Sequence, residues 1–271
     1  MVRLWLVASA LLTLILLLLF WETMGSAKLV GALVVPYLVF PWFLVVMVLG
    51  VEPMAGGRVE ALIDGILSRP VTRQEYFLAA WAARVTVVVG SYLLVIVPAV
   101  TLIALANRRA PVENVGFYGI VASLAVVALV LTFQVSLAFL VGTVLRRPLL
   151  AIVVLLFVWY PVNGLLSTFN LQSLSPIVLN KAIPTLAQQT WRKSDRVAVT
   201  TIDLGLLSLV PSGDSFANAF GPREGGQKPA KSEFFGQKFD DFSLLRVLLG
   251  YGLPTLAAVG LATLSFSMRD L

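Results

Sequence analysis

The sequence predicts an all-α polytopic membrane protein with six transmembrane helices, and two observations support this fold class. First, 59% of the 271 residues are apolar and only 13% are charged, against about 25% charged residues in an ordinary soluble domain. Second, six apolar runs approach or exceed the roughly 20 residues that cross a bilayer. The predicted spans are 4–20, 29–51, 77–106, 116–145, 149–166 and 244–268. We expect residues 1–271 to form a single membrane domain.

The first two apolar runs contain features that could change how they span the membrane. Run 4–20 could be a secretory signal, because the small residues Gly25, Ser26 and Ala27 follow it. It is longer than the roughly 7–15 residues of a signal's apolar core, so we expect a retained span. Run 29–51 contains Pro36 and Pro41. Since proline removes a helical hydrogen bond but is tolerated in spans, a kinked helix is expected there.

The later runs are interrupted only briefly until residue 166. Arg84 lies near the start of run 77–106, where a side chain that reaches back to the interface is a better interpretation than a substrate contact. Only Arg146, Arg147 and Pro148 separate runs 116–145 and 149–166. With so short a connection, these two helices should be antiparallel neighbours.

The segment between the second and third spans, residues 52–76, is the longest polar interruption in the first two-thirds of the chain. Its apolar residues recur at helical spacing on one face, and its acidic residues recur on another, which predicts a short amphipathic helix. Pro70 should end that helix, because its ring clashes with the preceding turn. The apolar face comprises Val59, Leu62, Ile63, Ile66 and Leu67, and the polar face Glu60, Asp64 and Ser68.

A second helix is predicted to begin directly after Pro70. Thr72 and Glu75 have the T-x-x-E spacing of a capping box, in which each side chain bonds the backbone N–H of the other residue. This helix should continue without interruption into the span 77–106. Residues 52–76 are therefore predicted to form an amphipathic helix, a corner and the polar foot of the third span. The alternative is an amphipathic helix that merely lies on lipid headgroups.

The segment 167–243 has a mixed character and is predicted to lie outside the membrane core. Its apolar piece Leu204–Val210 is too short to cross a bilayer. Residues 221–236 are polar and rich in glycine and proline, which predicts a mobile loop. This outer segment offers a surface for a partner on the outer side.

Basic residues in the short loops predict the orientation in the membrane. With the N-terminus inside, the basic residues on the cytoplasmic side outnumber those on the outer side, and the long segment 167–243 is left out because long loops translocate regardless of charge. Both termini and residues 52–76 are therefore expected in the cytoplasm. The inner set is Arg3, Arg58, Arg69, Arg73, Arg84, Arg146, Arg147 and Arg269, and the outer set is Lys28, Arg108 and Arg109.

The same residues resemble a known family, the permease subunits of type-2 ATP-binding cassette (ABC) exporters. That family has an acidic residue at the end of the second span, an amphipathic coupling helix, and a phrase close to L-L-S-x-P-V-S-R-x-E. The chain differs from the family in two respects. Ala80 stands where a lysine is common, and the amphipathic helix that usually precedes the first span is nearly absent. The matching residues are Glu52, Glu60, Leu62, Ile66, Leu67, Ser68, Pro70, Val71, Thr72, Arg73 and Glu75, with the ending Phe266–Leu271.

The resemblance implies a permease subunit in the cell membrane that forms the substrate pathway and couples to a separate ABC ATPase subunit. A second permease copy or paralogue and membrane lipid would be its other partners. The chain has no G-x-x-x-x-G-K-[ST] motif, so no P-loop binds nucleotide here and ATP would be bound by the partner subunit. The implied ATPase-coupling residues are Glu52, Glu60, Leu62, Ile63, Asp64, Ile66, Leu67, Pro70, Thr72, Arg73 and Glu75.

Two polar residues within the spans are candidates for a substrate pathway. Gln134 and Asn163 could each contact substrate, although interhelical hydrogen bonding is the more common role of such residues.

Other function classes fit the sequence less well. The chain has no histidine and no cysteine, which excludes a Ser-His-Asp triad and the usual zinc sites, so we expect no catalytic site, metal or cofactor in this chain. No carboxylate lies within a predicted span, which argues against an intramembrane aspartyl dyad and against proton or sodium coupling. The formal charge of +6 comes from residues at the ends of apolar runs, so no nucleic acid partner is expected. The main alternative is a non-transporting membrane anchor that recruits a cytoplasmic partner through the same helix.

Overall fold

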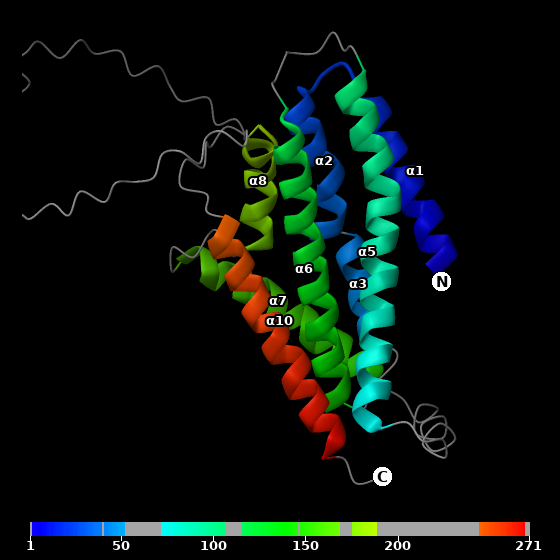
Figure 1. Cartoon of the computed structure of the whole chain (residues 1–271), viewed down its shortest axis with the longest axis vertical. Helices are drawn as coiled ribbons and strands as arrows, with labels where there is room; N and C mark the ends of the chain where they lie inside the picture. Colours follow the sequence, from blue (N-terminus) through cyan, green and yellow to red (C-terminus); the bar gives the residue numbers. More distant parts are fainter. Residues whose placement is uncertain are drawn as a thin grey trace, which may run out of the picture. The chain divides into compact units, whose positions relative to one another are not determined.

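The computed structural model describes residues 2–39, 41–51, 72–106, 115–145, 147–168, 175–188 and 244–268. All secondary structure within these ranges is helical (Figure 1). The helices are α1 (Val2–Phe20), α2 (Ser26–Leu38), α3 (Trp42–Val51), α5 (Arg73–Leu105), α6 (Phe117–Val144), α7 (Pro148–Thr168), α8 (Pro176–Ala187) and α10 (Leu244–Ser267).

The predicted all-α, multi-pass character is confirmed at the level of helix length and composition. Five described segments are long and apolar enough to cross a membrane: Val2–Phe20, Ser26–Val51, Gln74–Leu105, Phe117–Val144 and Val247–Ser267. The predicted span 149–166 falls within α7, whose portion Pro148–Phe157 forms a shorter apolar stretch. A count of six spans stays a prediction.

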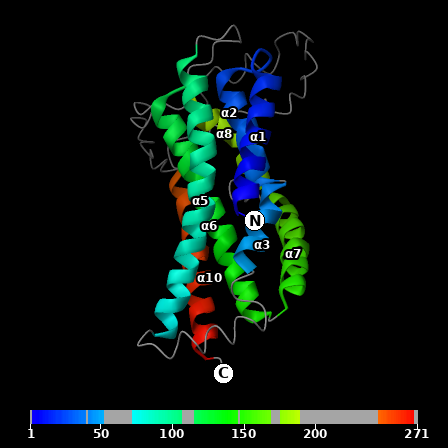
Figure 2. The same cartoon turned by 90° about the vertical axis from the view of Figure 1, so that its right-hand side faces the viewer.

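Helix α6 is the centre of the packing. It contacts α2, α3, α5, α7, α8 and α10, and it lies among these helices in two perpendicular views (Figures 1 and 2). A helix that is apolar around most of its circumference must be surrounded by other helices or by lipid. The buried apolar side chains of its central part are Val126, Val127, Val130, Leu131, Val135, Ala138 and Phe139.

The second predicted span, 29–51, is two helices rather than one kinked helix. Helix α2 continues through Pro36 and ends at Leu38, where the Val39 N–H donates to the Val35 carbonyl at 2.9 Å. Helix α3 begins at Trp42, and the Leu44 N–H donates to the Pro41 carbonyl at 3.1 Å. Pro41 has no N–H to continue the ladder of α2, and its ring disfavours a helical residue before it. The break therefore lies at the second proline.

The predicted outer segment, 167–243, includes a helix that the sequence analysis did not single out, α8, which packs against α2 and α6. Pro176 occupies the first turn of α8, where a missing N–H costs nothing. The buried residues Leu179, Ala182, Ile183 and Leu186 recur at i, i+3, i+4 and i+7, so one helical face joins the core. Residues 189–243 lie outside the described ranges.

Two glycines let α8 approach its neighbours closely. A Cβ at Gly31 of α2 would meet Pro184 Cγ at 2.8 Å, and a Cβ at Gly119 of α6 would overlap the carbonyl oxygens of Leu186 and Ala187. The Gly116 N–H, just before α6, donates to the Ala187 carbonyl at 3.1 Å. The end of α8 is thus held against the start of α6.

Candidate coupling and pathway site

The foot of α5 begins where the sequence predicts. Thr72 is the N-cap with an extended backbone (φ −72°, ψ 150°). The Glu75 N–H donates to Thr72 Oγ1 at 3.2 Å, and the Thr72 N–H donates to Glu75 Oε2 at 2.9 Å. This is the predicted capping box, and it satisfies two N–H groups that would otherwise lack partners at the helix start.

Helix α5 is longer than a bilayer requires. Its 33 residues correspond to roughly 50 Å at 1.5 Å per residue, against a hydrocarbon core of about 30 Å. Thr72, Gln74 and Glu75 at its start are exposed. One continuous, capped helix can therefore extend from the membrane core into the surrounding water.

Aromatic side chains anchor this foot to two other helices. Phe77 of α5 is fully buried. Its ring centroid lies 5.7 Å from that of Phe139 in α6 and 5.6 Å from that of Phe266 in α10. The start of α5 and the end of α10 are consequently at the same end of the bundle (Figure 1). Because a packed core is rigid, a displacement of the foot must also shift α6 and α10.

A hydrogen bond one turn further along α5 adds a directional contact. The indole Nε1 of Trp81 donates to Ser136 Oγ of α6 at 3.0 Å. The Ser136 hydroxyl in turn donates to the Thr132 carbonyl at 2.8 Å, which fixes its orientation. Rotation of α5 about its axis would break this bond, so the contact sets the angular register of α5 on α6.

Removing the N-cap should loosen the start of α5. We expect Thr72→Ala to destabilise the first turn by about 1 kcal/mol, because the Glu75 N–H loses its acceptor. Hydrogen exchange of the amides at 74–76 should then accelerate roughly five-fold, since exchange follows the local opening free energy. Thr72→Ser retains the acceptor and is the matched control. Unchanged exchange in Thr72→Ala would show that the box does not hold this turn.

Most of the other predicted coupling residues lie outside the described ranges. These are Glu52, Glu60, Leu62, Ile63, Asp64, Ile66, Leu67 and Pro70. Arg73 is the first residue of α5, directly after the N-cap. The predicted amphipathic helix and the corner at Pro70 thus stay predictions, and the capped foot is the part of the site that the structure describes.

The two predicted pathway residues lie on different helices. Gln134 is in the middle of α6 and is fully buried. Neither atom of its amide has a hydrogen-bond partner, so the interhelical bond expected for it is not formed. Asn163 lies in the second half of α7. A substrate contact for either stays a prediction.

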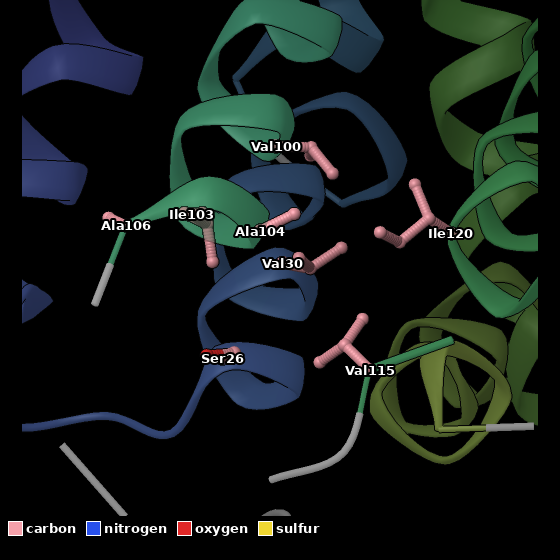
Figure 3. A pocket seen from close by; sticks show the side chains of 8 residues that line it. All are labelled: Ser26, Val30, Val100, Ile103, Ala104, Ala106, Val115 and Ile120. Carbon is pink, nitrogen blue, oxygen red and sulfur yellow. The ribbon is translucent and has the colours of Figure 1, made fainter. Parts of the chain in front are cut away.

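A cavity lies at the other end of the bundle from Phe77, between α2, α5 and the start of α6 (Figure 3). Its volume is about 240 Å³. Apart from Ser26, the residues that line it have apolar side chains, and backbone polar atoms also face it; the lining comprises Ser26, Val30, Val100, Ile103, Ala104, Ala106, Val115 and Ile120. Sequence reasoning did not find this cavity, since its lining comes from three separate helices.

Metal chemistry has no support in the described part of the chain, where no group of three or more histidine, cysteine, aspartate or glutamate side chains is placed to hold an ion. No family model matches the chain, and neither a curated protein nor a solved structure matches it.

Proposed function

We propose that this chain is the permease subunit of an ATP-driven type-2 ABC exporter, with a separate ATPase subunit that binds and hydrolyses ATP. The observation that carries the proposal is the capped foot of α5. It immediately follows the phrase Ile66-Leu67-Ser68-Arg69-Pro70-Val71, whose resemblance to the family extends through Glu75. The capping box of Thr72 and Glu75 belongs to the sequence motif that resembles the family, and both of its hydrogen bonds are present in the structure.

The packing of α5 gives this proposal a mechanical basis. Movement of an ATPase would act on residues 52–71, which join the start of α5 directly. The uninterrupted helix would carry that movement as a rigid element, because no proline occurs in α5 before Pro98. Phe77 and Trp81 would pass it to α6 and α10 through the ring and hydrogen-bond contacts described above.

The substrate pathway in this proposal lies between two permease copies or paralogues. Six spans, including α7, would place both termini and residues 52–76 in the cytoplasm and segment 167–243 outside. Gln134 is fully buried within one chain and its amide lacks a partner, so it is proposed to contact substrate only in a state in which the helices around α6 move apart. Asn163 is proposed on its sequence position alone.

Co-purification followed by reconstitution tests the proposal. Tagged full-length chain should capture a P-loop ATPase, and vesicles holding the complex should move a co-purifying substrate only with ATP. Capture of an ATPase without ATP-dependent movement of that substrate, over repeated preparations, would favour the alternative, a non-transporting anchor. Capture of no ATPase at all would contradict both the exporter and its coupling mechanism.

The orientation can be tested in intact cells, because the chain has no native cysteine. We expect Gln227→Cys to react with a membrane-impermeant maleimide added outside, whereas Arg69→Cys and Met268→Cys should react only after the cells are opened. The excess of basic residues on one side is the physical reason. Labelling of Arg69→Cys in intact cells would invert the proposed orientation.

A further inference from the structure

Four aromatic side chains bury polar atoms that make no well-formed hydrogen bond. They are Trp5 of α1, Tyr37 of α2, Trp42 of α3 and Tyr92 of α5. Trp5, Tyr37 and Tyr92 are 3%, 1% and 0% exposed. Buried polar groups in folded proteins are nearly always paired, so several orphans in one region require an explanation. We call these four residues the donor cluster.

The donor cluster surrounds the break between α2 and α3. The rings of Tyr37 and Tyr92 meet edge to face at 5.0 Å, and those of Trp5 and Trp42 meet edge to face at 6.5 Å. Trp5 shares one face of α1 with the buried residues Ser9 and Thr13, at i, i+4 and i+8. The Ser9 and Thr13 hydroxyls lie within hydrogen-bonding reach of the Tyr37 hydroxyl, so α1 joins the two ring pairs.

The chemistry of the donor cluster calls for an acceptor. An indole N–H can only donate, and a phenol hydroxyl can donate as well as accept. The two tyrosine hydroxyls do not bond each other. The Ser9 hydroxyl donates to the Leu6 carbonyl at 2.9 Å, so its oxygen can still accept from Tyr37. Tyr92, Trp5 and Trp42 have no such acceptor. Each unmade bond costs about 1–3 kcal/mol in a buried site, and more where hydrocarbon replaces water. An oxygen atom that accepts from these donors would remove that cost.

The acceptor should be uncharged. Among the side chains whose burial the structure describes, the buried serine, threonine, glutamine and asparagine residues are accompanied by no charged residue. A buried anion would need a paired cation to offset its desolvation. Neutral oxygens, such as those of water or of an ester carbonyl, carry no such requirement.

Helix α1 covers one side of this site and is the helix that can most easily move away from it. Only Trp5, Ser9 and Thr13 of its 19 residues are buried, and two of these side chains are small and polar. Its other side is a broad exposed apolar face that includes Leu4, Leu11 and Leu18. A helix held through so narrow a contact can separate at a lower cost than one buried around its circumference.

We propose that the donor cluster, with Ser9 and Thr13, is a binding site for neutral acceptor oxygens, which ordered water or the ester carbonyls of a phospholipid supply. The site lies beneath α1 at the α2–α3 break. Its occupation completes the hydrogen bonding of the four rings. The inference does not depend on the exporter function, because it rests on burial and on unpaired donors alone.

Conservative removal of the hydroxyls tests the site. Tyr92→Phe and Tyr37→Phe are made in the full-length chain, and thermal unfolding is followed in dodecyl maltoside micelles and in phosphatidylcholine nanodiscs. Loss of a satisfied hydroxyl should lower the Tm by roughly 2–6 °C per variant. Tyr76→Phe, at the half-buried foot of α5, should leave the Tm unchanged. The double variant should lose less than the sum of the two single losses, since both hydroxyls share one ligand.

The two media separate the two sources of oxygen. An equal fall in Tm in micelles and in nanodiscs assigns the site to water, and a fall confined to nanodiscs assigns it to phospholipid carbonyls. An unchanged or higher Tm for Tyr92→Phe in both media would overturn the proposal, because Tyr37→Phe also removes the interaction of that hydroxyl with Ser9 and Thr13. Removing a hydroxyl that binds nothing relieves its desolvation cost and cannot destabilise the fold.

Discussion

Alanine at position 119 is expected to displace α8 from the bundle. The added Cβ would overlap the carbonyl oxygens of Leu186 and Ala187. These are backbone atoms at the end of α8, so no side-chain rotation can relieve the overlap. The same movement would break the bond from the Gly116 N–H to the Ala187 carbonyl. Overpacking of this kind costs about 3 kcal/mol, which is a large share of the stability of a domain.

Gly90→Ala is the matched control for this substitution. Gly90 lies inside α5, and a Cβ there has no atom within 4 Å. Replacing glycine by alanine inside a helix should stabilise it by about 1 kcal/mol. Thermal unfolding should therefore show opposite shifts, a fall of roughly 6–12 °C for Gly119→Ala and a small rise for Gly90→Ala. Equal stability of the two variants would mean that α8 does not dock against Gly119.

The features that the sequence predicted well are local ones. The capping box at Thr72 depends on two side chains three residues apart, and the helix begins there because no distant contact is needed to form the two bonds. The membrane character likewise follows from long apolar runs, which set helix length and burial without reference to other segments. Such features depend on nearest neighbours, so a single sequence is sufficient.

The features that the sequence missed are set by distant partners. Pro36 and Pro41 look alike in the sequence, yet α2 continues through the first and ends before the second. The local effect of proline is the same at both positions, so the sequence alone does not say at which of them the helix ends. Helix α8 depends on Gly31 and Gly119, which are far away in the chain and give no local signal. The helical spacing of the apolar residues in α8 was the only feature of the sequence that indicated this helix.

Some residues of the candidate sites were recognisable from the sequence, and others only from their burial in the structure. Gln134 stood out as a polar residue in an apolar run, and it is indeed fully buried. Tyr37 and Tyr92 did not stand out, because aromatic residues are common in membrane helices and their orphan hydroxyls appear only when burial is known. The spacing of Trp5, Ser9 and Thr13 along one face of α1 was a usable signal, since it places a polar stripe on an otherwise apolar helix.

Leu62→Ala and Asp64→Ala are expected to weaken the complex with the ATPase in different ways. The sequence predicts Leu62 on the apolar face of the coupling helix and Asp64 on its acidic face. A buried apolar anchor contributes most of the affinity, so its truncation should cost about 2 kcal/mol, or roughly thirty-fold in Kd, at every salt concentration. A charge at the rim chiefly speeds association, so the effect of Asp64→Ala should be large at low salt and small at high salt.

Leu78→Ala is the control for loss of a leucine side chain. Leu78 lies in the foot of α5 and is 43% exposed, so its truncation should leave the ATPase bound. Binding of the purified permease to its ATPase is measured over a salt series, together with stimulated ATP hydrolysis. If Leu62→Ala and Asp64→Ala both bind and stimulate like the unaltered chain, residues 52–71 act as a passive interfacial helix. The exporter proposal would then lose its main support, whereas the donor cluster beneath α1 would be unaffected, because none of its residues belongs to the coupling stretch.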